Sequence, residues 1–171
     1  MVFLLGVNLV FAGFVLTLNG LSYKIEVDSK TKGAANLLVG IVIAINAILQ
    51  TVIANSYFEF GFAAAIWLFS LNYLMIAFHI FYQSENWQVF GIYSLFAAVF
   101  SIIFAINNLV YNGPWELVYM WIMWAILWGQ SFVAITLKCH KADKLSGAVL
   151  VINGIMSTFI PGVLILLGII L

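Results

Sequence analysis

Six long apolar stretches, separated by short clusters of charged and turn-forming residues, constrain this chain more than any other feature. Apart from Lys138, at the end of the fifth stretch, none of them contains Asp, Glu, Lys or Arg. About 20 apolar residues cross the hydrocarbon core of a bilayer as a helix. Each stretch therefore predicts one membrane-spanning helix. The six predicted spans are residues 2–22, 34–56, 61–82, 89–110, 117–138 and 147–170.

The scarcity of charge excludes a soluble fold. Charged residues make up 7% of the 171 residues, whereas soluble domains carry about 25%. A β-barrel is also excluded, because the stretches lack an alternating polar face, and open strands would leave backbone groups unsatisfied in lipid. The start, MVFLLGVNLV, lacks the basic region of a signal peptide and is interpreted as the first span. We predict an all-α membrane protein with one six-helix domain over residues 1–171.

The distribution of lysine predicts the orientation. All six lysines lie in the first and fifth breaks between spans: Lys24, Lys30, Lys32, Lys138, Lys141 and Lys144. Both breaks are odd-numbered, so they lie on one side of the membrane, and the positive-inside rule makes that side cytoplasmic. Both termini are therefore predicted to be extracytoplasmic.

The spans contain almost none of the groups that pumps and enzymes use. Coupled transporters usually carry ionisable residues in the membrane, and the only candidate here is His79, which an ordinary interfacial role also explains. No nucleophile motif, charged ring or carbonyl filter is present. The single Cys139 excludes a multi-cysteine metal site, and a net charge of zero gives no basic patch for nucleic acid. We predict no enzymatic activity, no metal and no cofactor.

The polar side chains of the spans are mostly neutral amides. An amide in lipid is costly unless it finds a partner, so these side chains should point inward. Most of them are explained as hydrogen-bonded contacts between helices. One or two could instead offer an amide to a passing polar solute. The asparagines concerned are Asn8, Asn19, Asn36, Asn46, Asn72, Asn107 and Asn153.

A stripe of tryptophan marks the fifth span. Trp121, Trp124 and Trp128 are spaced i, i+3 and i+7, which places them on one helical face. Trp124 and Trp128 lie too deep for an interfacial belt, and an indole N–H needs an acceptor. Ordinary helix packing and the wall of a narrow slot both explain this stripe.

The first and third spans offer aliphatic faces that could complete such a slot. Leu9, Ala12, Leu16 and Asn19 recur at helical spacing in the first span, and Leu71, Met75 and His79 do so in the third. A dry slot of tryptophan and aliphatic side chains excludes ions, which would lose their hydration without replacement. A small planar neutral molecule could still stack on an indole and make one or two hydrogen bonds.

Several strings, in order along the chain, resemble the AmiS/UreI family of bacterial urea and short-chain amide channels. In the first hairpin they are GFVLTLNG (residues 13–20) and VDSKTKGAANLLVG (residues 27–40). The later ones are IYSLFAAV in the fourth span, WIMWAILW (residues 121–128) in the fifth and NGIMSTFIPG (residues 153–162) in the last. The resemblance covers nearly the whole chain.

This resemblance implies passive conduction of urea or small amides across the bacterial inner membrane. It also implies a homo-hexamer with lipid in its centre and one pore through each protomer. The third span matches less closely than the first and fifth. The pore-lining positions carried over are Leu9, Ala12, Leu16, Asn19, Leu71, Met75, Trp124, Leu127 and Trp128.

Two departures from a gated member of that family suggest a pore without an acid gate. The gated member has long, histidine-rich loops outside the membrane, whereas His79 and His140 here both lie toward the predicted cytoplasmic side. In the last span Asn153 stands where the gated member has glutamate, and asparagine cannot change charge. We therefore place the chain closer to the ungated amide-channel branch and add Asn153 to the predicted polar contacts along the path.

The resulting prediction is an ungated channel for short amides or urea. The alternative from another class is a non-transporting membrane scaffold whose amides only join helices. A secondary transporter is disfavoured, because the spans lack buried ionisable groups.

Overall fold

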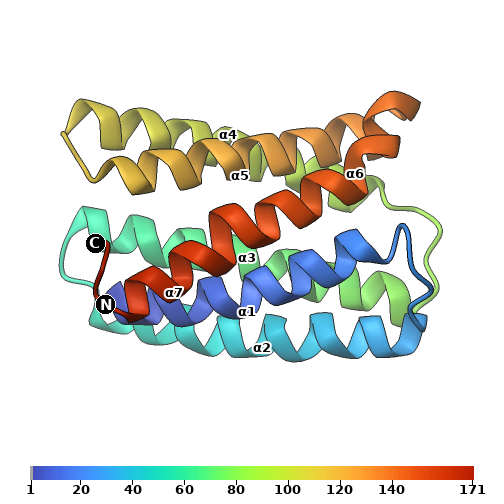
Figure 1. Cartoon of the computed structure of the whole chain (residues 1–171), viewed down its shortest axis with the longest axis horizontal. Helices are drawn as coiled ribbons and strands as arrows, with labels where there is room; N and C mark the ends of the chain where they lie inside the picture. Colours follow the sequence, from blue (N-terminus) through green and yellow to red (C-terminus); the bar gives the residue numbers. More distant parts are fainter. Residues whose placement is uncertain (1) are drawn as a thin grey trace.

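The computed structural model describes residues 2–171, and of Val2 and Phe58 only the backbone. Within these residues six helices are long and apolar enough to cross a membrane (Figure 1). The prediction of an all-α, six-span architecture is confirmed. The helices are α1 (Val2–Leu21), α2 (Ser29–Ile53), α3 (Tyr57–Phe81), α4 (Gln88–Val110) and α5 (Trp115–Ile135), and the sixth span joins α6 (His140–Ile152), the π-helical η1 (Asn153–Phe159) and α7 (Ile160–Leu166).

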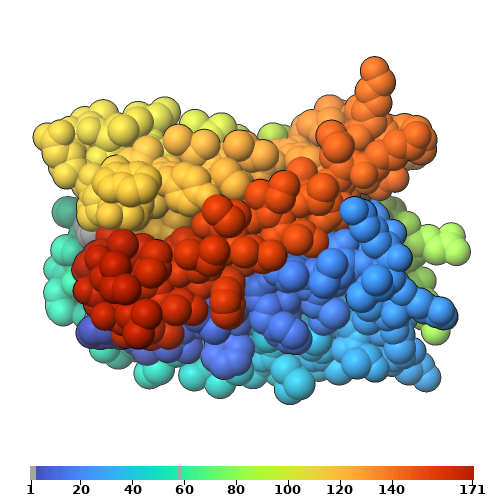
Figure 2. All heavy atoms as spheres, viewed as in Figure 1, coloured from blue at the N-terminus to red at the C-terminus, as the bar shows by residue number. Residues whose placement is uncertain are grey.

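The spans form two antiparallel hairpins, α2 with α3 and α4 with α5, which α1 and the sixth span hold together (Figure 1). In Figure 2 the side chains of the sixth span, orange to red, cover the seam between the α4–α5 hairpin and α1. The connections after α1, α3 and α5 gather at one end, which we call the lysine end, and the two chain termini lie at the opposite end. The predicted grouping of the two lysine-rich breaks is thus observed.

Several helix boundaries differ from the predicted spans, and the sixth span begins at His140, seven residues earlier than predicted. Helix α2 begins five residues earlier than predicted, because the carboxylate of Asp28 accepts hydrogen bonds from the Thr31 backbone N–H at 2.7 Å and from its hydroxyl at 2.8 Å. This is an N-cap, which satisfies a free donor of the first helical turn. Helix α5 ends at Ile135, so Lys138 lies outside it, with a left-handed φ of 52°.

The sixth span contains a wide π-helical turn that the apolar pattern did not predict. The hydroxyls of Ser157 and Thr158 both donate to the carbonyl oxygen of Asn153, at 2.8 and 3.0 Å. The Ile160 N–H bonds to the Ile155 oxygen, five residues back. Pro161 follows at once, and its ring would clash with the carbonyl four residues earlier in a regular α-helix. The wider turn accommodates that ring.

Glycines bring α1 and the sixth span into backbone contact. A Cβ atom on Gly13 would lie 2.7 Å from the Gly154 oxygen, and one on Gly20 would lie 2.7 Å from the Gly147 oxygen. A third pair, Gly6 and Gly162, repeats the pattern toward the termini. Small residues at such spacing allow close helix approach in a membrane, where van der Waals packing drives association.

The outer faces of the bundle are apolar. Phe96 and Ile103 on α4 and Leu38 on α2 are each more than half exposed. A continuous apolar surface of this kind is stable against lipid or a neighbouring subunit and unstable against water.

Candidate functional site

The three tryptophans of the α5 stripe are buried, as ordinary packing and a slot both require. The Trp128 indole N–H donates to the Oδ1 atom of Asn72 on α3, at 3.2 Å. The indole N–H groups of Trp121 and Trp124 have no partner in the protein. A buried indole N–H usually finds an acceptor, so these two donors are exceptions.

An aromatic layer lies directly beyond Trp128 toward the terminal end. The Phe69 ring of α3 packs edge-on to Trp124 at a centroid distance of 4.9 Å and against Trp128 at 5.0 Å. Trp121 packs edge-on to Trp124 at 4.9 Å. These rings are buried and pack against one another.

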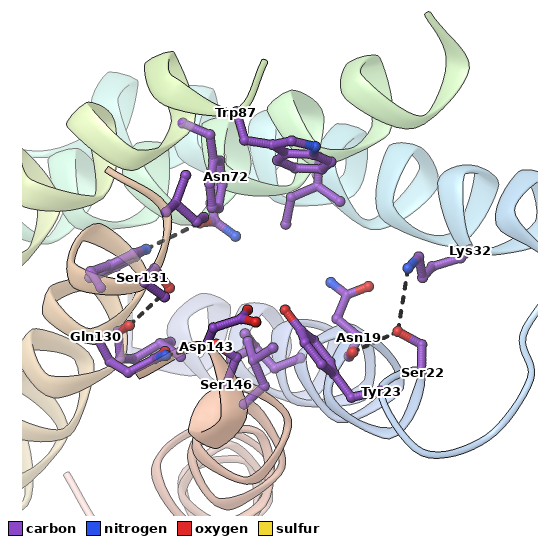
Figure 3. A pocket seen from close by; sticks show the side chains of 18 of the residues that line it. Asn19, Ser22, Tyr23, Lys32, Asn72, Trp87, Gln130, Ser131, Asp143 and Ser146 are labelled. Atoms are coloured by element: carbon purple, nitrogen blue, oxygen red, sulfur yellow. Dashed lines mark hydrogen bonds between the residues drawn. The ribbon is translucent and has the colours of Figure 1, made fainter. Parts of the chain in front are cut away.

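A cavity of about 550 Å³ opens between this aromatic layer and the lysine end (Figure 3). Its inner end is formed by Leu16 of α1, Asn72 of α3, and Leu127 and Trp128 of α5. The inner part has no charged residue, and its polar groups are neutral amides and hydroxyls. It suits a small neutral solute that makes a few hydrogen bonds.

The mouth of the cavity carries one charge of each sign. Lys32 of α2 donates to the Ser22 hydroxyl at 3.3 Å, and Asp143 of α6 lies across the mouth beside Tyr23 (Figure 3). Partial burial of the Tyr23 phenol raises its pKa, a hydrogen bond with Ser146 lowers it, and the Asp143 carboxylate raises it. The net shift is upward, so Tyr23 stays a neutral hydroxyl at the mouth.

Two amide arrangements support the cavity wall. Asn19 of α1 and Asn36 of α2 exchange two hydrogen bonds of 2.9 Å each, so each amide donates to the other. Gln130 of α5 donates to the Ser146 hydroxyl at 2.7 Å and to the Ala142 carbonyl oxygen at 2.8 Å. Both pairs fix the positions of helices around the cavity, which is the inter-helix role expected for amides in a membrane.

Most predicted residues of the first and fifth spans come together. Leu16, Asn19, Leu127 and Trp128 line the cavity. Trp124 lies one turn deeper, in the aromatic layer. The other two predicted α1 residues, Leu9 and Ala12, are buried but do not line the cavity. The Ala12 carbonyl oxygen accepts a hydrogen bond from the Tyr73 hydroxyl at 3.1 Å.

The third span presents a different face from the predicted one. Leu71 does not reach the cavity and is 43% exposed on the outer surface, and Met75 is half-buried outside the lining. The lining residues of α3 are Asn72, Ile76 and Ile80, one position further along. A shift of one residue along a helix turns the inward-facing side by about 100°. The polar Asn72 was the sequence signal that could have identified the inward-facing side of α3.

Asn153 is buried within the sixth span, and its hydrogen bonds stay inside its own helix. Its Nδ2 atom donates to the Val149 oxygen at 3.1 Å, and its Oδ1 atom accepts from Ser157 at 3.1 Å. It is not part of the cavity lining. The structure therefore does not bring Asn153 to the other predicted site residues.

Further lining residues come from the ends of helices, where apolar patterns carry little information. Trp87 lies at the start of α4 and stacks on His79 at a centroid distance of 4.3 Å. The two His79 ring nitrogens lie 2.9 Å from the Met75 oxygen and 3.1 Å from the Asn86 oxygen. His79 therefore closes the α3–α4 connection and does not line the cavity. Among the described residues no group of three or more His, Cys, Asp or Glu could hold a metal.

Comparison with known proteins identifies similar membrane proteins. The chain is 27% identical to the acid-activated urea channel of Helicobacter pylori strain 26695, over 92% of this chain and 95% of that protein. It is 24% identical to a putative amidate substrates transporter protein of Mycolicibacterium smegmatis, over 95% of this chain and 76% of that one. The cryo-EM structure of the Helicobacter pylori urea channel in its closed state superposes with a TM-score of 0.83, at 25% identity, covering 95% of this chain and 97% of that one.

The model of AmiS/UreI family transporters matches residues 4–169, which is almost the whole sequence. This is a family of multi-pass membrane transporters and not of enzymes, so the predictions of a membrane location and of no enzymatic activity are confirmed. The chain belongs to the AmiS/UreI family of transporters.

Proposed function

We propose that this protein is a passive channel for small neutral amides, including urea, in a bacterial inner membrane. The observation that carries the proposal is the cavity that ends at Trp128, Leu16 and Leu127, with the aromatic layer behind it. A planar amide fits this chemistry, since it can stack on an indole and exchange hydrogen bonds with the Asn72 amide. One helical turn deeper than Trp128, the unpaired indole N–H of Trp124 could donate to the carbonyl oxygen of the permeating amide.

Two further observations support selectivity for neutral solutes. The inner cavity and the aromatic layer contain no charged side chain, so an ion would lose its water without compensation. The names of the similar proteins, a urea channel and an amidate transporter, point to the same solute class. The inter-helix bonds of Asn19 and Gln130 would also suit a non-transporting scaffold, whereas the cavity supports the channel.

We further propose that the pore has no acid gate. The sequence holds two histidines, and both lie at the lysine end, His79 in the last turn of α3 and His140 at the start of α6. The connections at the opposite end, 54–56 and 111–114, contain no group that titrates between about pH 5 and 8. We propose, in addition, a homo-hexamer with one pore per protomer and both termini outside the cytoplasm, as the resemblance and the lysine distribution imply.

The test is solute uptake into proteoliposomes, followed by stopped-flow light scattering with gradients of acetamide, urea and glycerol. Uptake of acetamide or urea should be linear in the gradient, insensitive to protonophores, and equal at about pH 5 and about pH 7.5. If neither amide enters faster than into empty liposomes, the channel proposal is wrong. A steep increase at the lower pH would contradict the ungated proposal alone.

The variant Trp124→Ala separates a channel from a scaffold. In a channel, removing this indole widens the aromatic layer and changes the ratio of acetamide to glycerol uptake while the assembled protein persists. The matched control is Trp115→Ala, because Trp115 is exposed at the start of α5, away from the cavity. If wild type, Trp124→Ala and Trp115→Ala all show the same ratio of acetamide to glycerol uptake, Trp124 does not line the conduction path.

A further inference from the structure

A second group of amide side chains lies on α1 and α2, apart from the cavity, and two of its three members, Asn8 and Gln50, are buried. On α2, Gln50 is 0% exposed, and neither its Nε2 nor its Oε1 atom has a hydrogen-bond partner in the protein. One helical turn before it, the Asn46 Nδ2 atom donates to the Asn8 Oδ1 atom of α1 at 2.9 Å. The Nδ2 atom of Asn8 is also buried without a partner. We call Asn8, Asn46 and Gln50 the amide cluster.

Protein groups alone do not satisfy every hydrogen-bonding atom of the amide cluster. Buried polar groups in folded proteins almost always have a hydrogen-bond partner, supplied by the protein or by ordered water. The amide pair of Asn19 and Asn36, between the same two helices, meets this rule with two bonds of 2.9 Å. The amide cluster leaves two N–H groups and one carbonyl oxygen without partners, although all three atoms are shielded from the exterior.

The missing partner must come from a small neutral molecule. Helix α1 has no charged residue, and the charges of α2 are Lys30 and Lys32, at the other end of that helix. An ion at the amide cluster would therefore have no counter-charge on α1 or α2, and the carboxylate of Glu59 at this end of α3 accepts from the exposed Asn55 N–H. A lipid or a second subunit is also excluded, because Gln50 has no exposed surface to contact it.

The spacing of the amide cluster suits a single bridging molecule. Asn46 and Gln50 are four residues apart, and such side chains are neighbours on one helical face, with Cβ atoms about 6 Å apart. Asn8 is already bonded to Asn46. A bridging molecule would need to accept from the N–H groups of Gln50 and Asn8 and to donate to the Gln50 oxygen. Water does this in buried polar sites, and a short amide has the same donors and acceptor.

We propose that the amide cluster binds one small neutral molecule, with hydrogen-bond donors and an acceptor, between Gln50 and Asn8. Water and a short amide share this chemistry. The site is separate from the cavity at the lysine end, and its existence does not depend on the proposed conduction of amides.

The test is a cryo-EM map of the protein in lipid nanodiscs, at a resolution that shows ordered water. A density peak within hydrogen-bond distance of the Gln50 amide and of Asn8 Nδ2 is expected. The peak should disappear in Gln50→Leu, which removes both polar atoms at similar volume. It should persist in Thr51→Val, the matched control, because the Thr51 hydroxyl bonds to the Ala47 oxygen of its own helix at 2.8 Å.

A second map with acetamide added identifies the bound molecule. An unchanged, compact peak assigns water, and a peak that becomes larger and planar assigns the amide; both results support the site. Absence of a peak in both wild-type maps overturns the proposal, as does a map in which Gln50 and Asn8 bond directly to each other. The wild-type maps decide the question even if Gln50→Leu fails to fold, and they are independent of any uptake measurement.

Discussion

Replacing Gly13 by alanine tests the backbone contact between α1 and the sixth span. The new Cβ atom would lie 2.7 Å from the Gly154 oxygen and from the backbone nitrogen and Cβ of Phe159. Favourable contacts of carbon with other heavy atoms lie at about 3.5–4.0 Å. The two helices would have to separate by roughly 1 Å here, because backbone atoms cannot rotate away.

The magnitude follows from two opposing effects. Overpacking a tight contact costs about 1–3 kcal/mol, and a clash with backbone belongs at the upper end of that range. Alanine recovers up to about 1 kcal/mol of helix propensity relative to glycine. The net loss of unfolding free energy in Gly13→Ala is therefore about 2 kcal/mol. For a chain of this length that lowers the melting temperature by roughly 4–8 °C.

The assay is thermal unfolding of the purified protein in detergent, followed by tryptophan fluorescence. Gly129→Ala on α5 is the matched control, because its new Cβ would meet only the Ala98 Cβ, at an ordinary 3.9 Å. We expect Gly129→Ala to melt at or slightly above the wild-type temperature. If Gly13→Ala also melts there, the close approach of the two backbones does not limit stability, and the reasoning is refuted.

Two further predictions concern single hydrogen-bonding groups. Trp128→Phe keeps an aromatic ring but leaves the buried Asn72 oxygen without its donor. The free energy of unfolding should fall by about 1–3 kcal/mol, and the acetamide-to-glycerol uptake ratio should change. The control Trp115→Phe should change neither, and equal melting temperatures of Trp128→Phe and wild type would contradict a stabilising role of the Trp128–Asn72 bond. Hydrogen bonds from the backbone and hydroxyl of Thr31 lower the pKa of Asp28 below its ordinary 3.8. The stabilisation from the Asp28 carboxylate is therefore complete above pH 3.8 and is lost as the pH falls through the lowered pKa of the folded state. Asp28→Asn should therefore flatten the acid limb of the stability curve measured by fluorescence, and an unchanged limb would show that this cap does not contribute.

The sequence alone was sufficient for the membrane architecture. Transfer of an apolar helix into lipid depends on the composition of that segment, so six long apolar stretches determine six spans without knowledge of their neighbours. The alternation of the spans likewise determines which connections share a side, and the lysine clusters predict that their side is cytoplasmic. The stripe of tryptophan on α5 and the spacing of Leu16 and Asn19 on α1 also identified residues that line the cavity.

The tertiary structure decided which face each helix presents. Helix α3 has no strong apolar stripe, so hydropathy alone does not distinguish the face of Leu71 from that of Asn72. The polar Asn72 is a hint, and its bond to Trp128 of α5 shows which face points inward. The π-helical turn at Asn153 depends on hydroxyl bonds and a proline that hydropathy does not weigh. The unpaired amide of Gln50 could not be read from the chain either, because whether a buried group has a partner depends on distances between helices.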